Sequence, residues 1–261
     1  MFQFLESQSL PVVLLVILGF QFARYLLIAG GTFALFWGLL RQKNQGKKID
    51  PKPVSFTDIR REILWSFLTF LIFLLPAFLI VKGRREGWLH LESGPLSQYG
   101  FFLFGALIIT MLAIHDFYFY WIHRWMHSQF LYRWFHEVHH RSLNPTPWAA
   151  FAFHPLEALL ESAVVYLFIF LLPMHAAAIF VFQLLSLLMN VYGHLGYDIT
   201  PRGWRDHSVL RWVNTTRNHH WHHQRFNGNY GLYTTLWDRL FGTYRELAEV
   251  GSFQGARGSL N

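Results

Sequence analysis

Four long apolar blocks separated by polar loops dominate the pattern along the chain. They cover residues 10–40, 63–81, 101–122 and 156–191. A helix that crosses a bilayer needs about 20 predominantly apolar residues, so the second and third blocks are each about as long as one crossing. The first block is longer, and its helix must tilt, bend or begin at the membrane interface. Pro173 divides the fourth block and predicts two shorter helices that return to the side they left.

Composition and loop charge turn this pattern into a membrane topology. The chain has 261 residues, of which 53% are hydrophobic and only 14% are charged, which is too apolar for a soluble domain of this length. Residues 41–62 carry seven lysines and arginines against three acids, whereas residues 82–100 carry three basic residues. The positive-inside rule therefore places the basic side in the cytoplasm. The net charge of +7 follows these loops and forms no nucleic-acid-reading motif, so we expect no nucleic-acid partner.

Histidines gather in three short segments, "HRWMH", "HEVHH" and "NHHWHH". The first segment continues a stripe that begins at Asp116 and Tyr120 with helical spacing, so these polar groups lie on one face of a helix that leaves the membrane. The other two segments repeat the spacing i, i+3 and i+4. The repeated spacing predicts metal binding by His123, His127, His136, His139, His140, His219, His222 and His223.

The number and type of these ligands indicate two metal ions. The chain has no cysteine, so any metal is bound without thiolates. A tetrahedral site uses about four ligands, and the histidines are about twice that number. Imidazole binds iron, zinc, copper and nickel, and ligand type alone leaves the choice open. A site beside lipid favours chemistry on an apolar molecule, and iron with dioxygen suits a C–H bond that has no acidic proton.

Five segments in order resemble the fatty acid hydroxylase/sterol desaturase superfamily of membrane di-iron enzymes. They are "HRWMH", "HEVHH", "NPTPWAAFAFHPLE", "NVYGH" and "NHHWHHQRFNGNYGLYTTLWDRLFGTYRE", and they cover about residues 116–246. The third and last are most similar to the sterol Δ5-desaturase (lathosterol oxidase) branch. The resemblance implies a mushroom-shaped helical fold and two iron ions with dioxygen as cosubstrate, although zinc could replace iron in purified protein. It adds His194 to the eight metal ligands named above.

Three further residues are candidates for catalytic roles. Asn190 stands where some family hydroxylases carry a histidine, and it could hold a water molecule. His154 either caps a helix ahead of Pro155 or lines the site. Asp116 ends an apolar block, and we expect it to orient a ligand histidine or to pair with Arg124.

These features predict an all-α fold, with a membrane stalk of four to five spans and a cytosolic histidine-rich cap. Residues 1–100 would hold the first spans and the basic loop, residues 101–250 the catalytic domain, and residues 251–261 a tail. We expect a multi-pass membrane oxidoreductase that hydroxylates or desaturates a sterol-like or fatty acyl lipid. The alternative is a membrane zinc hydrolase that acts on a lipid ester or amide.

The electrons for this reaction must come from another protein. The sequence has no GxGxxG loop, no cysteine for an iron–sulfur cluster and no "HPGG" haem segment. We therefore expect an external donor, a ferredoxin or cytochrome with its reductase. Basic residues that could attract an acidic carrier to the cap are Arg202, Arg205, Arg211, Arg217 and Arg225.

Overall fold

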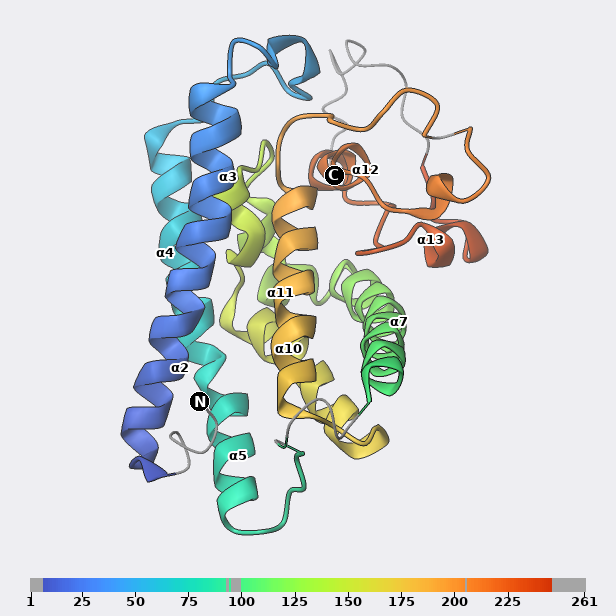
Figure 1. The fold of residues 1–261 in the computed structure, drawn as a ribbon. Helices are drawn as coiled ribbons and strands as arrows, with labels where there is room; N and C mark the ends of the chain where they lie inside the picture. Colours follow the sequence, from blue (N-terminus) through green and yellow to red (C-terminus); the bar gives the residue numbers. More distant parts are fainter. Residues whose placement is uncertain (1–6, 93, 95–99, 205, 246–261) are drawn as a thin grey trace.

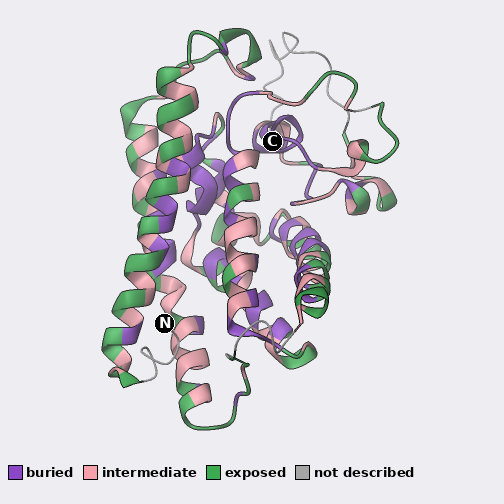
Figure 2. Ribbon diagram, viewed as in Figure 1, coloured by how far each residue is buried: buried purple, intermediate pink, exposed green. Residues whose placement is uncertain are grey.

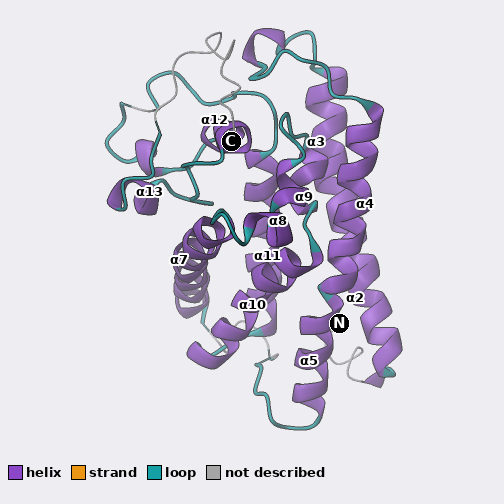
Figure 3. Ribbon diagram, turned by 180° about the vertical axis from the view of Figure 1, so that it is seen from behind, coloured by secondary structure: helices purple, strands orange, loops and turns teal. Residues whose placement is uncertain are grey.

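The computed structural model describes residues 7–92, 94, 100–204 and 206–245, and within these ranges the fold is all helical, with only isolated β-bridges. The long helices lie side by side, and a cap of shorter helices covers one end (Figures 1 and 3). The elements that make up the long helices are α2 (Leu10–Tyr25) with its continuation η1 (Leu26–Gly30), α3 (Gly31–Phe33) and η2 (Ala34–Leu39), then α4 (Phe56–Ile72), α5 (Leu74–Arg85), α7 (Phe101–Met126), α10 (Pro155–Leu171) and α11 (Ala176–Gly193). The shorter ones are η3 (Gln45–Lys47), α8 (Tyr132–Phe135), α9 (Glu137–His140), η4 (Pro147–Phe151), η5 (Leu210–Trp212), α12 (Thr216–Arg225) and α13 (Leu236–Leu240).

The first two apolar blocks form two long helical segments that run in opposite directions. The first is continuous from Leu10 to Leu39, with two π-helical stretches in its second half. The second extends well beyond the apolar block and covers Phe56–Arg85. It is interrupted at Phe73, three residues before Pro76, because proline cannot donate the backbone hydrogen bond that would continue the helix.

The fourth block forms the expected helical hairpin. Helix α10 begins at Pro155 behind the N-cap residue His154, and α11 begins behind His175. The break at residues 172–175 contains Pro173, as the sequence predicts. Four segments are long and apolar enough to cross a membrane, namely Leu10–Leu39, Phe56–Arg85, Phe101–Met126 and Ala176–Gly193. Helix α10 has 17 residues and pairs with the last of these.

The outer faces of the long helices and the junction between stalk and cap differ in solvent exposure. Large apolar side chains are exposed along the outer faces of the long helices (Figure 2), and examples are Leu27, Phe102 and Phe170. Exposed apolar surface on this scale marks a face that contacts lipid. The cap is anchored to the stalk through the carbonyl of Trp148 in η4, which accepts hydrogen bonds from Tyr25 Oη (2.7 Å) and Ser66 Oγ (3.1 Å).

This arrangement predicts which loops share one side of the membrane. The loop around Gln45 and the cap loop around Asp206 lie at the capped end, and the exposed residue Glu86 follows α5 at the opposite end. Because the chain has no cysteine, single variants Gln45→Cys, Asp206→Cys and Glu86→Cys can each be labelled with a membrane-impermeant thiol reagent. The first two should label from the same side and the third from the other. Labelling of Gln45→Cys and Asp206→Cys from opposite sides would rule out this fold in the membrane.

Candidate metal centre

Nine histidines converge in the cap as two adjacent groups. In each group one nitrogen per residue lies within 4.8 Å of the corresponding nitrogens of the others. The first group, group 1, contains His123, His127, His136, His140 and His222. The second, group 2, contains His139, His194, His219 and His223. These are the nine residues that the spacing and the resemblance indicate.

Four separate elements supply these side chains. The end of α7 carries His123, and His127 is its C-cap residue. Helix α9 follows the N-cap residue His136, α11 ends at the C-cap residue His194, and α12 presents the last three histidines. Because residues three and four apart share a helix face, α9 and α12 each contribute to both groups. The two groups are therefore joined through the same short helices.

Contacts at the outer nitrogen fix the ring orientation of several histidines. His123 Nδ1 donates to the Tyr230 carbonyl (2.8 Å), His222 Nδ1 to the Gly228 carbonyl (2.8 Å) and His194 Nδ1 to the Asn190 carbonyl (2.7 Å). A carbonyl only accepts, so Nδ1 carries the proton in these rings and Nε2 presents a lone pair.

Glu157 has the same function for His136. Its carboxylate Oε1 lies 2.6 Å from His136 Nδ1, and both side chains are buried. The Nε2 atoms of His136 and His123 have no hydrogen-bond partner although they are buried. An unpaired buried polar atom costs free energy, and two of them pointing into one cluster indicate a missing ligand.

A loop that follows α12 holds the carbonyls that orient His123 and His222. Asp238 in α13 accepts hydrogen bonds from the backbone N–H groups of Tyr230 (2.9 Å) and Gly231 (2.8 Å). A Cβ at Gly231 would lie 2.3 Å from the Thr234 carbonyl oxygen, so only glycine allows this close turn. The "NYG…TTLWDRL" segment therefore acts as a support for two of the histidines.

Distances within the groups fit metal ligation better than hydrogen bonding. His194 Nε2 lies 3.3 Å from His139 Nε2, 3.1 Å from His223 Nε2 and 3.1 Å from His219 Nε2. One ring nitrogen cannot form three hydrogen bonds with other ring nitrogens. Ligand nitrogens at 2.0–2.1 Å around a tetrahedral ion would lie about 3.3 Å apart. The donor set and its spacing therefore fit a divalent cation that prefers imidazole.

The rings are also held in the neutral form that binds metal. Burial lowers the pKa of His194 to about 4, and burial together with repulsion between neighbouring rings lowers the pKa of His139 and His223 well below its ordinary value. The same direction and cause apply to His127, His136, His140, His219 and His222. Free lone pairs are therefore present at neutral pH.

Asp116 has different partners from those the sequence indicates. Its carboxylate accepts hydrogen bonds from Tyr233 N (2.9 Å), Thr234 N (3.2 Å) and Thr234 Oγ1 (2.5 Å), while Arg124 donates to Tyr120 Oη (3.0 Å). The expected contact with a ligand histidine or Arg124 is replaced by one with the loop after α12. Asp116 and Tyr233 are 117 residues apart, so local sequence patterns could not predict this contact.

The other candidate residues lie outside group 1 and group 2, and their contacts differ. Asn190 is buried, lines the main cavity described below and has a backbone carbonyl that orients His194. His154 Nδ1 accepts from Leu156 N (3.3 Å) and caps α10, which is the structural alternative raised above. His220 belongs to neither group, as its helical position indicates, but it is fully buried and contacts Gln224.

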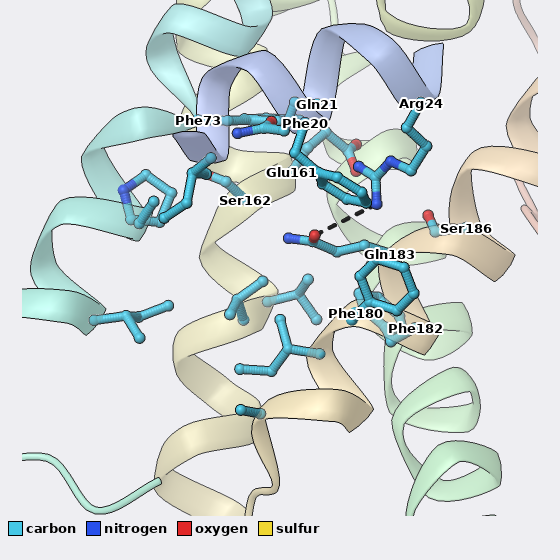
Figure 4. Close-up of a pocket in the computed structure, with 18 of the residues that line it drawn as sticks. Phe20, Gln21, Arg24, Phe73, Glu161, Ser162, Phe180, Phe182, Gln183 and Ser186 are labelled. Atoms are coloured by element: carbon cyan, nitrogen blue, oxygen red, sulfur yellow. Dashed lines mark hydrogen bonds between the residues drawn. The ribbon is translucent and has the colours of Figure 1, made fainter. Parts of the chain in front are cut away.

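A cavity of about 560 Å³ runs between α2, α5, α10 and α11 and reaches the cap. Pockets of roughly 300–1,000 Å³ hold drug-sized ligands. Its walls are mainly apolar, and Figure 4 shows several polar side chains that extend into it. Phe153 lines the cavity, and its ring centroid lies 5.2 Å from that of His139. The cavity therefore ends against group 2.

Comparison with known proteins agrees with this site. Residues 108–243 match the fatty acid hydroxylase family model. The chain is 33% identical to human lathosterol oxidase over 201 residues, which are 76% of this chain and 64% of that protein. It is 36% and 35% identical to Delta(7)-sterol 5(6)-desaturases of Gibberella zeae and Leptosphaeria maculans, over 65% and 69% of this chain and 46% and 48% of those proteins. The chain thus spans about half to two thirds of the length of these relatives. No solved structure matches.

The family match covers more than half of the chain and includes all nine histidines, so the chain belongs to the fatty acid hydroxylase family.

Proposed function

We propose that this protein is an oxygen-dependent di-iron enzyme that hydroxylates or desaturates a lipid. The family and the names of the relatives support an oxidoreductase that acts on lipids, and the apolar helices support a multi-pass membrane protein. The observation that carries the finer proposal is the convergence of nine neutral imidazoles, in two groups, at the end of an apolar cavity. The relatives named as sterol desaturases favour a sterol-like substrate over a fatty acyl chain.

Group 1 and group 2 would each hold one iron ion. When bound, the iron pair would supply the oxidising chemistry with dioxygen that removes hydrogen from an unactivated carbon. The protein's own residues orient the rings through Glu157, Asn190 and the loop supported by Asp238. The apolar cavity walls hold the lipid against the centre and keep water away from it. Asn190 lies at the cavity wall beside His194, where its side chain could hold a water molecule or contact the substrate.

The cap and the basic loop would face the cytoplasm, since residues 41–62 at the capped end carry seven basic residues, whereas residues 82–100 carry three. In the cysteine-labelling experiment described above, this orientation means that only Glu86→Cys reacts in intact cells.

The metal assignment predicts two ions per chain, each dependent on its own group. Freshly prepared protein should contain about two metal ions, with iron in the active form and zinc as a possible replacement. His222→Ala in group 1 and His139→Ala in group 2 should each abolish turnover and lower the metal content toward one ion. The control is His207→Ala, since His207 caps a loop outside both groups. Full metal occupancy in both group variants, measured by elemental analysis, would refute the assignment.

Glu157 provides a subtler test of the same centre. Glu157→Gln keeps the size of the side chain but weakens the acceptor for His136 Nδ1, and such changes lower metal affinity by roughly 10–100-fold. The matched control is Glu137→Gln, whose exposed carboxylate pairs with Arg141. Metal affinity measured by competition with a chelator should fall for Glu157→Gln alone. Equal affinities in the two variants would remove Glu157 from the metal centre.

The electron donor would be a separate acidic carrier that docks on the cap. Arg202 and Arg211 are exposed there, whereas Arg217 is buried and pairs with Asp198 (3.4 Å), so it cannot form part of a docking face. Arg205 lies outside the described residues.

Turnover should therefore require dioxygen and a carrier. Purified protein with lipid, dioxygen and NADPH should be inactive, and a reductase with a small acidic ferredoxin or cytochrome should restore oxidation, less effectively at high salt. Mass spectrometry of the lipid would show a gain of one oxygen or a loss of two hydrogens. Lipid hydrolysis in the absence of dioxygen would instead support the zinc hydrolase. Sustained oxidation with NADPH alone would contradict the need for an external donor.

A further inference from the structure

A buried cation occupies the wall of the lipid cavity without an acidic partner. Arg24 in α2 is 8% exposed and lines the cavity, and no carboxylate among the described residues lies within ion-pair distance of it. Its Nη1 donates to Gln183 Oε1 at 3.5 Å, and its Nε has no hydrogen-bond partner (Figure 4). A charged side chain in a membrane span is costly, and such residues mark functional sites in membrane proteins.

Other polar groups extend into the same part of the cavity. Gln21 lies one turn before Arg24 on α2, Glu161 is on α10, and Gln183 is on α11 (Figure 4). Ser162 and Ser186 also line this region. These side chains form a polar patch in a cavity that is otherwise mainly apolar, and we call Arg24, Glu161 and Gln183 the polar rung.

The polar rung lies at the capped end of the cavity. Glu161 follows Glu157, which holds His136, by one helical turn, or about 6 Å along α10. Gln183 precedes Asn190, which orients His194, by two turns, or about 10 Å along α11. Tyr25, the neighbour of Arg24, bonds the Trp148 carbonyl in the cap. A polar group bound here would lie a short distance from the histidine groups.

The hydrogen-bonding groups of the polar rung suit a hydroxyl head group. Arg24 only donates hydrogen bonds, whereas the carboxyl group of Glu161 and the amide oxygen of Gln183 can accept them. A hydroxyl group both donates and accepts, so it can use both kinds of partner. An ionised carboxylate or phosphate only accepts hydrogen bonds and would offer these acceptor oxygens no donor.

We propose that the polar rung binds the hydroxyl head of an amphipathic lipid, which enters the cavity head first. This inference rests on the proposed function, and it deepens it by naming a substrate-binding residue outside the region that the family model matches. It also places the oxidised carbons in the part of the lipid nearer the hydroxyl rather than far along a tail. A sterol-like alcohol meets both requirements.

Binding of fluorescent lipids tests the proposal without catalysis. The probes are dehydroergosterol, which has a hydroxyl head, its 3-deoxy analogue, which has no oxygen to accept from Arg24 or to donate, and cis-parinaric acid, which has a carboxylate head. Energy transfer from the protein's 11 tryptophans reports binding to the detergent-solubilised full chain. Because a hydrogen bond to a charged group changes affinity by roughly 10–100-fold, the wild type should bind the alcohol at least about tenfold more tightly than the 3-deoxy analogue.

Variants assign this preference to residues. Arg24→Met should reduce the ratio of the two affinities to about threefold or less, and Gln183→Met should reduce it by a smaller factor and serves if Arg24→Met fails to fold. The control Arg84→Met, which removes a cation from the other part of the cavity wall, should keep the wild-type ratio.

Several results would overturn the proposal. They are equal binding of the alcohol and the 3-deoxy analogue by the wild type, no binding of either, an unchanged ratio in the folded Arg24→Met or Gln183→Met variant, or Arg24-dependent binding of cis-parinaric acid in preference to the alcohol. Failure of the metal or oxygen assays leaves these binding ratios unaffected, so the two proposals fail separately.

Discussion

Nine imidazoles, eight of them buried and that of His127 half-buried, must present their lone pairs toward two points, and the rest of the cap is arranged around that requirement. Ring nitrogens packed at 3.0–3.3 Å without an intervening cation are unfavourable, because each neutral ring has only one proton to share. In four of the nine rings the opposite nitrogen is held by an acceptor, namely the carbonyl of Tyr230, Gly228 or Asn190 or the carboxylate of Glu157. These acceptors set the direction in which the lone pairs of those four rings point.

The membrane stalk serves this centre in two ways. Its helices end at the cap, so α7 and α11 deliver histidines directly from the bilayer to the site. Helices α2, α5, α10 and α11 enclose the cavity that ends at Phe153 against His139. A lipid in this cavity would lie in mainly apolar surroundings except where it meets the polar rung. The cost of placing Arg24 in this setting is explained if a polar head group completes its interactions.

Much of the centre could be predicted from local spacing, because ligands three and four residues apart on short helices leave a periodic signature. The hairpin break at Pro173 is readable for a similar reason, since proline acts on its own helix. The supporting carboxylates could not be predicted in this way. Glu157 is 21 residues from His136, and Asp116 is 117 residues from Tyr233, so their partners depend on the tertiary fold. Asp116 shows the consequence, because Arg124, the arginine nearest to it in the sequence, donates to Tyr120 instead.

X-ray absorption of the iron-loaded enzyme would examine the metal centre most directly. If the nine histidines ligate two ions, the spectrum will show four to five imidazole nitrogens per iron at about 2.0–2.2 Å, with the multiple scattering of the rings. A first shell dominated by carboxylate or water oxygen, with one or two imidazoles per iron, would show that the histidine groups are not the metal site.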